Sequence, residues 1–588
     1  MKEKGFTLVE LLAVIAILAI LVIIALPNVL KMYNNAKKNS FLTEAKTIAQ
    51  DVSSKYITES MKGNKLTTIS NKQNSLDLSG RDIEYEFKLD SNGKIKSMMV
   101  YDGTYCVVTI KDYTNLKTSD VKNKCSYDEI HNIVGTLSKN FYEKSGKTDR
   151  SLVKSIEFYS DGRTISGAES YDVSEKGDNS IIMYVKQNSE DSSLLDLTLV
   201  ANGTISFPED SSKLFTFNRL NWNTTYGNLT SIQFNHSVDT SKVTNMTGMF
   251  YDSKVTTLDL SDFDTSKVTS MTGMFNDSKV TTLDLSSFDT SKVTDMGKMF
   301  DGSETTEIKG LEKFNTSKVT NMDGMFASSK ITSLDLSSFD TSKVTSMTGM
   351  FYDSKVTTLD LSGFDTSKVT DMGRMFDGSE TTEIKGLEKF NTSNVTDMWG
   401  MFASSKITSL DLSSFDTSNV TSMYYMFARS KVTSLDLSTF DTSKVTSMHD
   451  MFYDSKVTTL DLSSFDTSKV TNMSHMFNGS EATEIKGLEK FNTSNVTNMD
   501  CMFASSKITS LDLSSFDTSN VTDMRSMFYN SKVTSLDLSS FDTSKVTDMN
   551  RMFWEAKATT GYARTQADAD KFNASSDKPS TLTFVVKQ

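Results

Sequence analysis

The first hydrophobic feature of the chain is the apolar run from Phe6 to Leu26, which a single charge, Glu10, interrupts. As an α-helix it would be about 30 Å long, which matches the hydrocarbon core of a bilayer. Lys2 and Lys4 precede the run, so we expect the N-terminus inside and the following chain outside. An ordinary signal peptide is the alternative, but its apolar core is shorter and a small-residue cleavage site follows it, whereas Pro27 follows here.

The hydrophobic period then changes. Residues 32–60 mix polar and apolar side chains at helical spacing, which predicts that the helix continues. Residues 83–89 alternate apolar and polar side chains, 90–93 have the composition of a hairpin turn, and 105–110 predict another strand. We expect a long helix on a small antiparallel sheet, together forming one domain over residues 6–130.

A third pattern fills the C-terminal half of the chain. The pair Met-Phe recurs every 25 or 26 residues, thirteen times within residues 226–553, and another Met stands three residues before each pair. In the unit at 279–300, apolar positions first follow the pattern L-x-x-L-x-L and then return at one-turn spacing. This predicts a leucine-rich-repeat-like β solenoid of thirteen coils, whose short strands form a parallel sheet about 60 Å long.

The flanking segments have no repeat and are expected to close the ends of the array. Residues 131–225 contain strand-like runs and predict a β-rich cap or linker, with 207–215 directly before the first coil. Residues 554–588 are expected to form a C-terminal cap. Both caps are needed because terminal coils would otherwise expose an unpaired edge and an open core.

The segment GFTLVE, from Gly5 to Glu10, resembles the processing motif of type IV pilins and pseudopilins. The resemblance implies that a prepilin peptidase removes the leader, residues 1–5, and that the new N-terminal Phe6 is methylated. It also implies that Glu10 pairs with the terminal amine of a neighbouring pilin subunit, which would explain a carboxylate inside a membrane span. Pro27 corresponds to the helix-kinking proline of that family.

The repeated sequence LDLSSFDTSKVT followed by MxxMF resembles the BspA-like leucine-rich repeats of bacterial surface proteins. This resemblance covers residues 226–553. It implies extracellular display or adhesion, with an unknown extracellular protein or glycan as ligand.

Composition narrows the possible partners. The chain has 62 Lys and Arg against 75 Asp and Glu, a net charge of −13, which argues against nucleic acid as a partner. With 4 His and 3 Cys in 588 residues we expect neither a metal site nor a cofactor. Cys106 and Cys125 would lie outside the membrane and are a candidate disulfide, with two buried thiols as the alternative.

Two sets of surface positions are candidates for binding. The solvent-facing strand position is mostly Asp, with Lys in the 26-residue units, as at Asp284 and Lys309. The lysines either relieve repulsion or leave an acidic row that binds cations or a basic ligand. The two positions inside Met-x-x-Met-Phe vary most, through either ligand binding or drift. The candidate ligand-facing residues are Trp399, Tyr424, Tyr425, His449, His475, Arg525 and Arg551.

No nucleophile in the sequence has a placed base and orienting partner, so we expect no enzymatic activity. We predict a cell-surface adhesion or display protein that is anchored in the cytoplasmic membrane or assembled into a type IV pilus-like filament. Its C-terminal region would be extracellular. The alternative is a pseudopilin-like structural component of a secretion or DNA-uptake machine.

Overall fold

The computed structural model describes residues 8–71, 74–78, 83–90, 92–109, 112–123, 133–146, 150–216 and 227–587, with side chains from residue 29 onward. The chain forms two compact units, which we describe separately. Unit 1 comprises residues 1–135 and 201–205, and unit 2 comprises residues 136–200 and 206–588.

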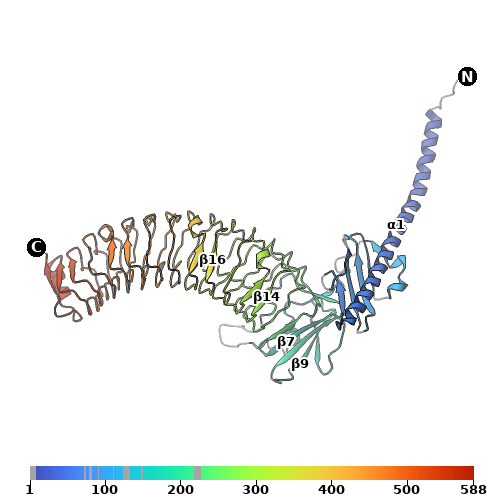
Figure 1. Ribbon diagram of the computed structural model, residues 1–588, viewed down its shortest axis with the longest axis horizontal. Helices are drawn as coiled ribbons and strands as arrows, with labels where there is room; N and C mark the ends of the chain where they lie inside the picture. The colour runs from blue at the N-terminus through green and yellow to red at the C-terminus, as the bar shows by residue number, and fades with distance from the viewer. Residues whose placement is uncertain are drawn as a thin grey trace. The chain divides into compact units, whose positions relative to one another are not determined.

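Unit 1 consists of one helix and a five-stranded antiparallel sheet (Figure 1). The strands follow one another in sequence order across the sheet, each antiparallel to the next. The elements are α1 (Leu8–Met61), β1 (Thr68–Ser70), β2 (Glu84–Leu89), β3 (Ile95–Tyr101), β4 (Tyr105–Thr109) and β5 (Lys122–Asn123), with the short 3₁₀ helices η1 (Tyr113–Asn115) and η2 (Thr118–Asp120).

The core of unit 1 lies between one face of α1 and the sheet. Buried α1 residues recur three or four positions apart, as helical packing requires. They are Phe41, Leu42, Ala45, Ile48, Ala49 and Val52, and they pack with Phe87, Val100 and Val107. The strands predicted at 83–89 and 105–110 are confirmed as β2 and β4. The turn between β2 and β3 contains Gly93, whose φ is +80°. A Cβ at this position would lie 2.2 Å from the Tyr56 ring, so the turn requires glycine.

Unit 2 begins with a mixed sheet of order β12-β7-β10-β9-β8. In this sheet β7 pairs in parallel with β10 and β12, while β8 and β9 are antiparallel. The elements of unit 2 are η3 (Phe141–Ser145), η4 (Arg150–Leu152), β7 (Val153–Tyr159), β8 (Glu169–Asp172), β9 (Ile181–Gln187), β10 (Leu195–Ala201), β12 (Ser231–Gln233) and β13 (Val238–Asp239). Most residues of β6 (Ile133–Thr136) and β11 (Thr204–Ser206) belong to unit 1.

The repeats stack as a curved row of turn-rich coils (Figure 1). Each coil joins the next by one isolated parallel bridge, in a series that runs from Asp210↔Asn245 to Asp523↔Asp548. The Phe of every Met-Phe pair is buried, and these rings form one column from Phe250 to Phe553. Successive rings are parallel to within 10°, with centroids 5.6–6.1 Å apart. The core of the array is therefore continuous along the stack.

The predicted fold class, a leucine-rich-repeat-like β solenoid with a sheet of thirteen short strands, is wrong. In the described part of the array no continuous sheet forms, and strands pair only two or three at a time, as β14-β15, β16-β17, β18-β19 and β20-β21-β22. Most coils are instead joined by turn-to-turn hydrogen bonds, such as Phe275 N–H to the Met299 carbonyl at 2.9 Å. The physical reason is a turn that begins directly after the predicted strand positions, as where the Phe288 N–H donates to the Leu285 carbonyl at 3.0 Å, so that only a few residues of each coil remain extended.

Three of the strand pairs form where a 26-residue unit follows a shorter one, and each second strand ends at a glycine. The Gly310 φ of 87° is left-handed, and a Cβ there would lie 2.5 Å from backbone atoms of Ser286. Gly386 and Gly487 repeat this close approach. The remaining elements are β14 (Thr282–Asp284), β15 (Glu307–Lys309), η5 (Leu311–Lys313), β16 (Thr358–Asp360), β17 (Glu383–Lys385), η6 (Leu387–Lys389), β18 (Thr459–Asp461), β19 (Glu484–Lys486), η7 (Leu488–Lys490), β20 (Ser535–Leu538), β21 (Thr560–Ala563), α3 (Gln566–Asn573) and β22 (Thr583–Val586).

Both ends of the array are covered. At the first coil β7 pairs with β12, so that Ile156 lies opposite Ile232. Phe215 extends the phenylalanine column by stacking on Phe250 at 5.6 Å. At the last coil β21 and β22 add two parallel strands to β20, and Phe572 and Phe584 pack against Phe553.

Candidate binding face on the repeat array

We define the variable face as the side chains at the two x positions of Met-x-x-Met-Phe in the thirteen coils. The flanking Met and Phe side chains are buried almost throughout, so the backbone of this segment is held against the core. The second x residue is left-handed in all thirteen coils, with φ between 51° and 64°. In five of the first seven coils that residue is glycine, at 248, 273, 324, 349 and 400.

The last six coils place a side chain at this left-handed position without exception. The residues are Tyr425, Asp450, His475, Cys501, Ser526 and Arg551. A left-handed conformation costs a non-glycine residue about 1–2 kcal/mol. Strain of this kind tends to persist where the side chain has a use, which makes the last six coils the candidate site.

The first x position contributes an aromatic stack, formed by Trp399, Tyr424 and His449 from three successive coils. The Trp399 and Tyr424 rings are 5.2 Å apart and inclined by 12°, and the Tyr424 and His449 rings are 4.6 Å apart and inclined by 10°. All three side chains are half-buried. Because the rings cover one another's faces, a ligand would meet their edges. The sequence predicted that these residues face a ligand, and the structure brings them together.

Gly373 and Arg374 shape the Trp399 end of the aromatic stack. A Cβ at Gly373 would lie 2.4 Å from the Trp399 indole nitrogen, so the ring needs glycine in the coil before it. The Arg374 guanidinium lies 3.9 Å from the Tyr352 ring centroid and 5.2 Å from that of Trp399. Its Nε donates to the Asp377 carboxylate at 2.8 Å. Sequence reasoning missed this arrangement, although its members lie about one 25-residue period apart.

A charged cluster adjoins the aromatic stack in the following coils. Arg525 Nη2 lies 2.9 Å from the Asp523 carboxylate and 3.3 Å from that of Asp500. His475 Nε2 lies 3.6 Å from the Asp500 carboxylate. The predicted residues His475 and Arg525 are thus linked through Asp500, which sequence reasoning did not select.

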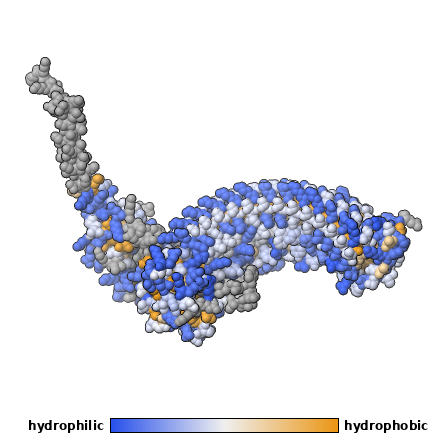
Figure 2. Space-filling model, turned by 180° about the vertical axis from the view of Figure 1, so that it is seen from behind, coloured by the Kyte–Doolittle hydropathy of each residue, from blue (hydrophilic) through white to orange (hydrophobic). Residues whose placement is uncertain are grey.

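Tyr425 and Arg551 are not part of this charged cluster. Tyr425 is half-buried. Arg551 is exposed, with its guanidinium 6.0 Å from the Trp554 ring centroid. The face of the array seen in Figure 2 carries mainly hydrophilic and intermediate side chains, with few hydrophobic ones.

Burial shifts several titrating groups along the variable face. It lowers the pKa of the His449 imidazole, against the opposing effect of Asp450. It raises the pKa of the Asp450 carboxyl, although His475 and His449 act in the other direction. It also raises the pKa of the Cys501 thiol to about 12, with a further contribution from Asp500. These groups therefore favour their neutral forms in the folded protein.

The acidic strand row has a local structural role. Asp284 Oδ1 accepts a hydrogen bond from the Ser286 N–H at 3.0 Å, and equivalent turns occur in other coils. At the paired strands Asp284 lies opposite Lys309. Hydrogen bonds from Ser286 lower the pKa of the Asp284 carboxyl most, and the charge of Lys309 lowers it further. The pairing of Asp284 with Lys309 favours the explanation that the lysines relieve repulsion.

Of the other predicted residues, Cys106 is buried in β4 and is disulfide-bonded, while its predicted partner Cys125 lies outside the described residues. Gly5 and Phe6 also lie outside them, as do the side chains of Glu10 and Pro27. Where side chains are described, no helix is both long and apolar enough to cross a membrane; the predicted span, 6–26, precedes that part.

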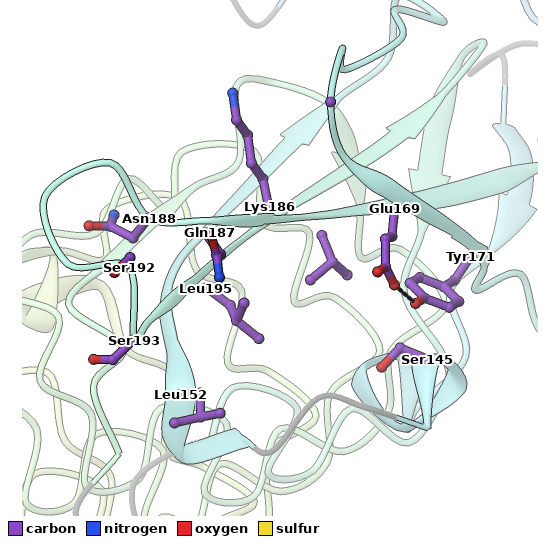
Figure 3. A pocket seen from close by; sticks show the side chains of 12 residues that line it. Ser145, Leu152, Glu169, Tyr171, Lys186, Gln187, Asn188, Ser192, Ser193 and Leu195 are labelled. Atoms are coloured by element: carbon purple, nitrogen blue, oxygen red, sulfur yellow. Dashed lines mark hydrogen bonds between the residues drawn. The ribbon is translucent and has the colours of Figure 1, made fainter.

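Unit 2 also has a pocket of about 730 Å³ outside the array, lined mainly from β8, β9 and β10 (Figure 3). The Tyr171 hydroxyl donates a hydrogen bond to the Glu169 carboxylate at its edge. Ser192 and Ser193 lie at the opposite side in Figure 3. The lining residues include neither His nor Cys, so this pocket lacks the usual base for a serine nucleophile.

The array matches a family model described as Mycoplasma protein of unknown function, DUF285, at residues 215–309, 295–384, 376–486 and 478–575. The chain belongs to this family. These matches overlap and together extend over residues 215–575, which is more than half of the 588 residues. Searches of curated proteins and of solved structures found no match.

Residues 1–26 match the prokaryotic N-terminal methylation motif. This match supports the predicted pilin-like N-terminus and implies processing by a prepilin peptidase and assembly with pilin subunits at the membrane. Together with the DUF285 repeats, it indicates a surface-displayed protein.

Proposed function

We propose that this protein is a pilus-borne or membrane-anchored adhesin, inserted through its processed N-terminal helix, whose repeat array binds an extracellular protein or glycan. The observation that carries the proposal is the joining of an N-terminal methylation motif at 1–26 to DUF285 repeats at 215–575 in one chain. The BspA-like character of the repeat sequence supports the adhesive role by resemblance.

The helix surface next to the motif supports insertion. Four large apolar side chains directly after Asn28 are exposed in the single chain, namely Val29, Leu30, Met32 and Tyr33. Further along, α1 buries its apolar side chains against the sheet, beginning at Phe41. The exposed stretch is therefore free to pack against a neighbouring subunit or to lie at the membrane interface.

The variable face supports binding. Its aromatic stack and charged cluster lie side by side on coils that share one scaffold, which is how repeat proteins build binding surfaces. Ring edges and ion pairs suit a polar ligand such as a glycan or a charged protein segment.

The test of display is to shear filaments from intact cells and to blot the sheared fraction, the membrane and the medium with an antibody to the repeats. We expect the repeats in the sheared fraction and expect Glu10→Ala to remove them from it. Glu3→Ala is the matched control, because this carboxylate lies in the leader that processing removes. Repeats confined to the membrane, unaffected by Glu10→Ala, would refute filament assembly and leave an anchor or a pseudopilin-like component.

A further inference from the structure

Three side chains with different metal-ligating atoms meet on the variable face. They are His475, Asp500 and Cys501, and one ligand atom from each lies within 4.8 Å of the other two. His475 and Cys501 occupy the left-handed second x position of neighbouring coils, and Asp500 occupies the first x position beside Cys501. The residues are 25 and 26 positions apart in sequence, so the repeat period itself brings them together.

We propose that His475, Asp500 and Cys501 bind one Zn²⁺ ion. When the ion binds, it replaces the Cys501 thiol proton, which passes to solvent. The resulting thiolate, with an imidazole and a carboxylate, is a donor set that zinc accepts readily. Calcium and magnesium require oxygen ligands and would gain little from Cys501 or His475. Three protein ligands leave the fourth tetrahedral position to water or to a donor from a bound partner.

The spacing fits with small side-chain rotations. Tetrahedral zinc separates a nitrogen and an oxygen ligand by roughly 3.4 Å, given bonds of about 2.0–2.2 Å. His475 Nε2 and the Asp500 carboxylate are already 3.6 Å apart. The three side chains are half-buried, so the site is open to an ion from solution while its ligands remain partly fixed.

Asn478 can orient the imidazole. Its amide nitrogen lies 3.0 Å from His475 Nδ1. With the amide reversed, the Asn478 carbonyl oxygen would accept a hydrogen bond from Nδ1–H and leave Nε2 free to bind the ion. An outer partner of this kind is typical of zinc-binding histidines.

Arg525 is the main competing cation, since its Nη2 lies 3.3 Å from the Asp500 carboxylate. The same guanidinium lies 2.9 Å from Asp523 and 3.6 Å from Asp548. Arg525 would therefore keep two carboxylate partners when Asp500 turns toward the ion.

The test is to titrate full-length protein in detergent, first with Co²⁺ and then with Zn²⁺. Cys501 is a free thiol and Cys106 is disulfide-bonded. We therefore expect a thiolate-to-cobalt charge-transfer band that saturates at one ion per chain. Zn²⁺ should displace the Co²⁺, remove the band and protect Cys501 from alkylation.

Variants separate this site from incidental binding. Cys501→Ser should abolish the charge-transfer band, and His475→Gln should weaken binding by more than about 100-fold, since losing even an outer partner costs 10–100-fold. Asn478→Ala should weaken it by about 10-fold. His236→Gln, which removes a histidine in the first coil, should leave it unchanged. Circular dichroism of each metal-free variant checks that the array still folds.

Absence of the band in wild-type protein, or a Zn²⁺ affinity that Cys501→Ser and His475→Gln leave unchanged in folded protein, would overturn the proposal. The proposal does not depend on adhesion or on filament assembly, because the titration uses neither cells nor an extracellular ligand.

Discussion

The first seven coils and the last six share one buried core but differ on the variable face. Five of the first seven have glycine at the left-handed position, whereas each of the last six has a side chain there. Phe275 and Phe477, one in each region, are equally buried and belong to the same column of parallel rings. The comparison teaches that the buried core determines how the coils stack. The variable face can differ between coils, and it accepts side chains whose left-handed backbone costs free energy where those side chains have a use.

The largest expected effect tests whether the core is the same in both regions. Phe275→Ala and Phe477→Ala should each destabilise the array by about 3–5 kcal/mol, because each leaves a large cavity in a continuous column. The measurement is urea unfolding followed by circular dichroism. Costs that differ between the two variants by more than about 2 kcal/mol would mean that the regions do not share one scaffold.

Gly373→Ala tests how the aromatic stack is positioned. The new methyl would lie 2.4 Å from the Trp399 indole nitrogen, so the ring must move, at a cost of about 1–3 kcal/mol. Near-ultraviolet circular dichroism should report the loss of stacking on Tyr424. Gly363→Ala is the control, because nothing lies within 4 Å of its Cβ position. An unchanged spectrum for Gly373→Ala would contradict the described packing.

A matched pair of substitutions measures the left-handed cost directly. Gly273→Ala should destabilise the array by about 1 kcal/mol, and Ser526→Gly should stabilise it by a similar amount. Space is not the issue at Gly273, because the nearest atom to its Cβ position is 3.6 Å away. The measurement is the melting temperature, which Gly273→Ala should lower and Ser526→Gly should raise. If the two melting temperatures do not shift in opposite directions, the backbone of the last six coils is not strained at this position.

The smallest effect is a pH response of opposite sign in the two regions. Burial raises the pKa of Asp301, in the early coils, to about 6. The contribution of this protonated carboxyl to stability is therefore fully present below the ordinary pKa of 3.8 and is lost as the pH rises through about 6. Burial lowers the pKa of His449, so stability from this residue is lost as the pH falls below about 6.5.

Asp301→Asn and His449→Gln should each remove one of these slopes from a plot of melting temperature against pH. If either variant keeps the wild-type slope, that residue is not the titrating group.

Sequence reasoning could predict the period, the buried Met-Phe pairs and the helix with its antiparallel sheet, because burial repeats along the chain at fixed spacing. It could not predict how the strands pair. Left-handed backbone is visible in sequence where glycine occupies the position, as at Gly273, but not where Tyr425 or Ser526 does. The turn between Leu285 and Phe288, which limits the predicted strand there, contains serines and no glycine or proline, so the sequence does not mark it clearly.

The site was predicted only in part. The residues between the two Met of each coil vary in type, and this variation identified Trp399 and His449 as candidates. That their rings stack could not be predicted, because stacking depends on the distance between neighbouring coils. The cluster of His475, Asp500 and Cys501 was not predicted for the same reason. With four histidines in 588 residues, composition argues against a metal site, and only the fold shows that three ligands lie close together.

The central claim is that binding resides on the variable face of the late coils, taken here from the seventh coil, which carries Trp399, to the thirteenth. The most direct measurement applies full-length protein in detergent to a printed array of glycans and extracellular-matrix proteins. The late-coil variant carries Trp399→Thr, Tyr424→Thr and His449→Thr, which copy the threonine of early coils. The early-coil control carries Thr247→Ala, Thr272→Ala and Thr348→Ala. We predict binding that the late-coil variant loses and the control retains; equal loss in both, or undiminished binding by the late-coil variant, would contradict the claim.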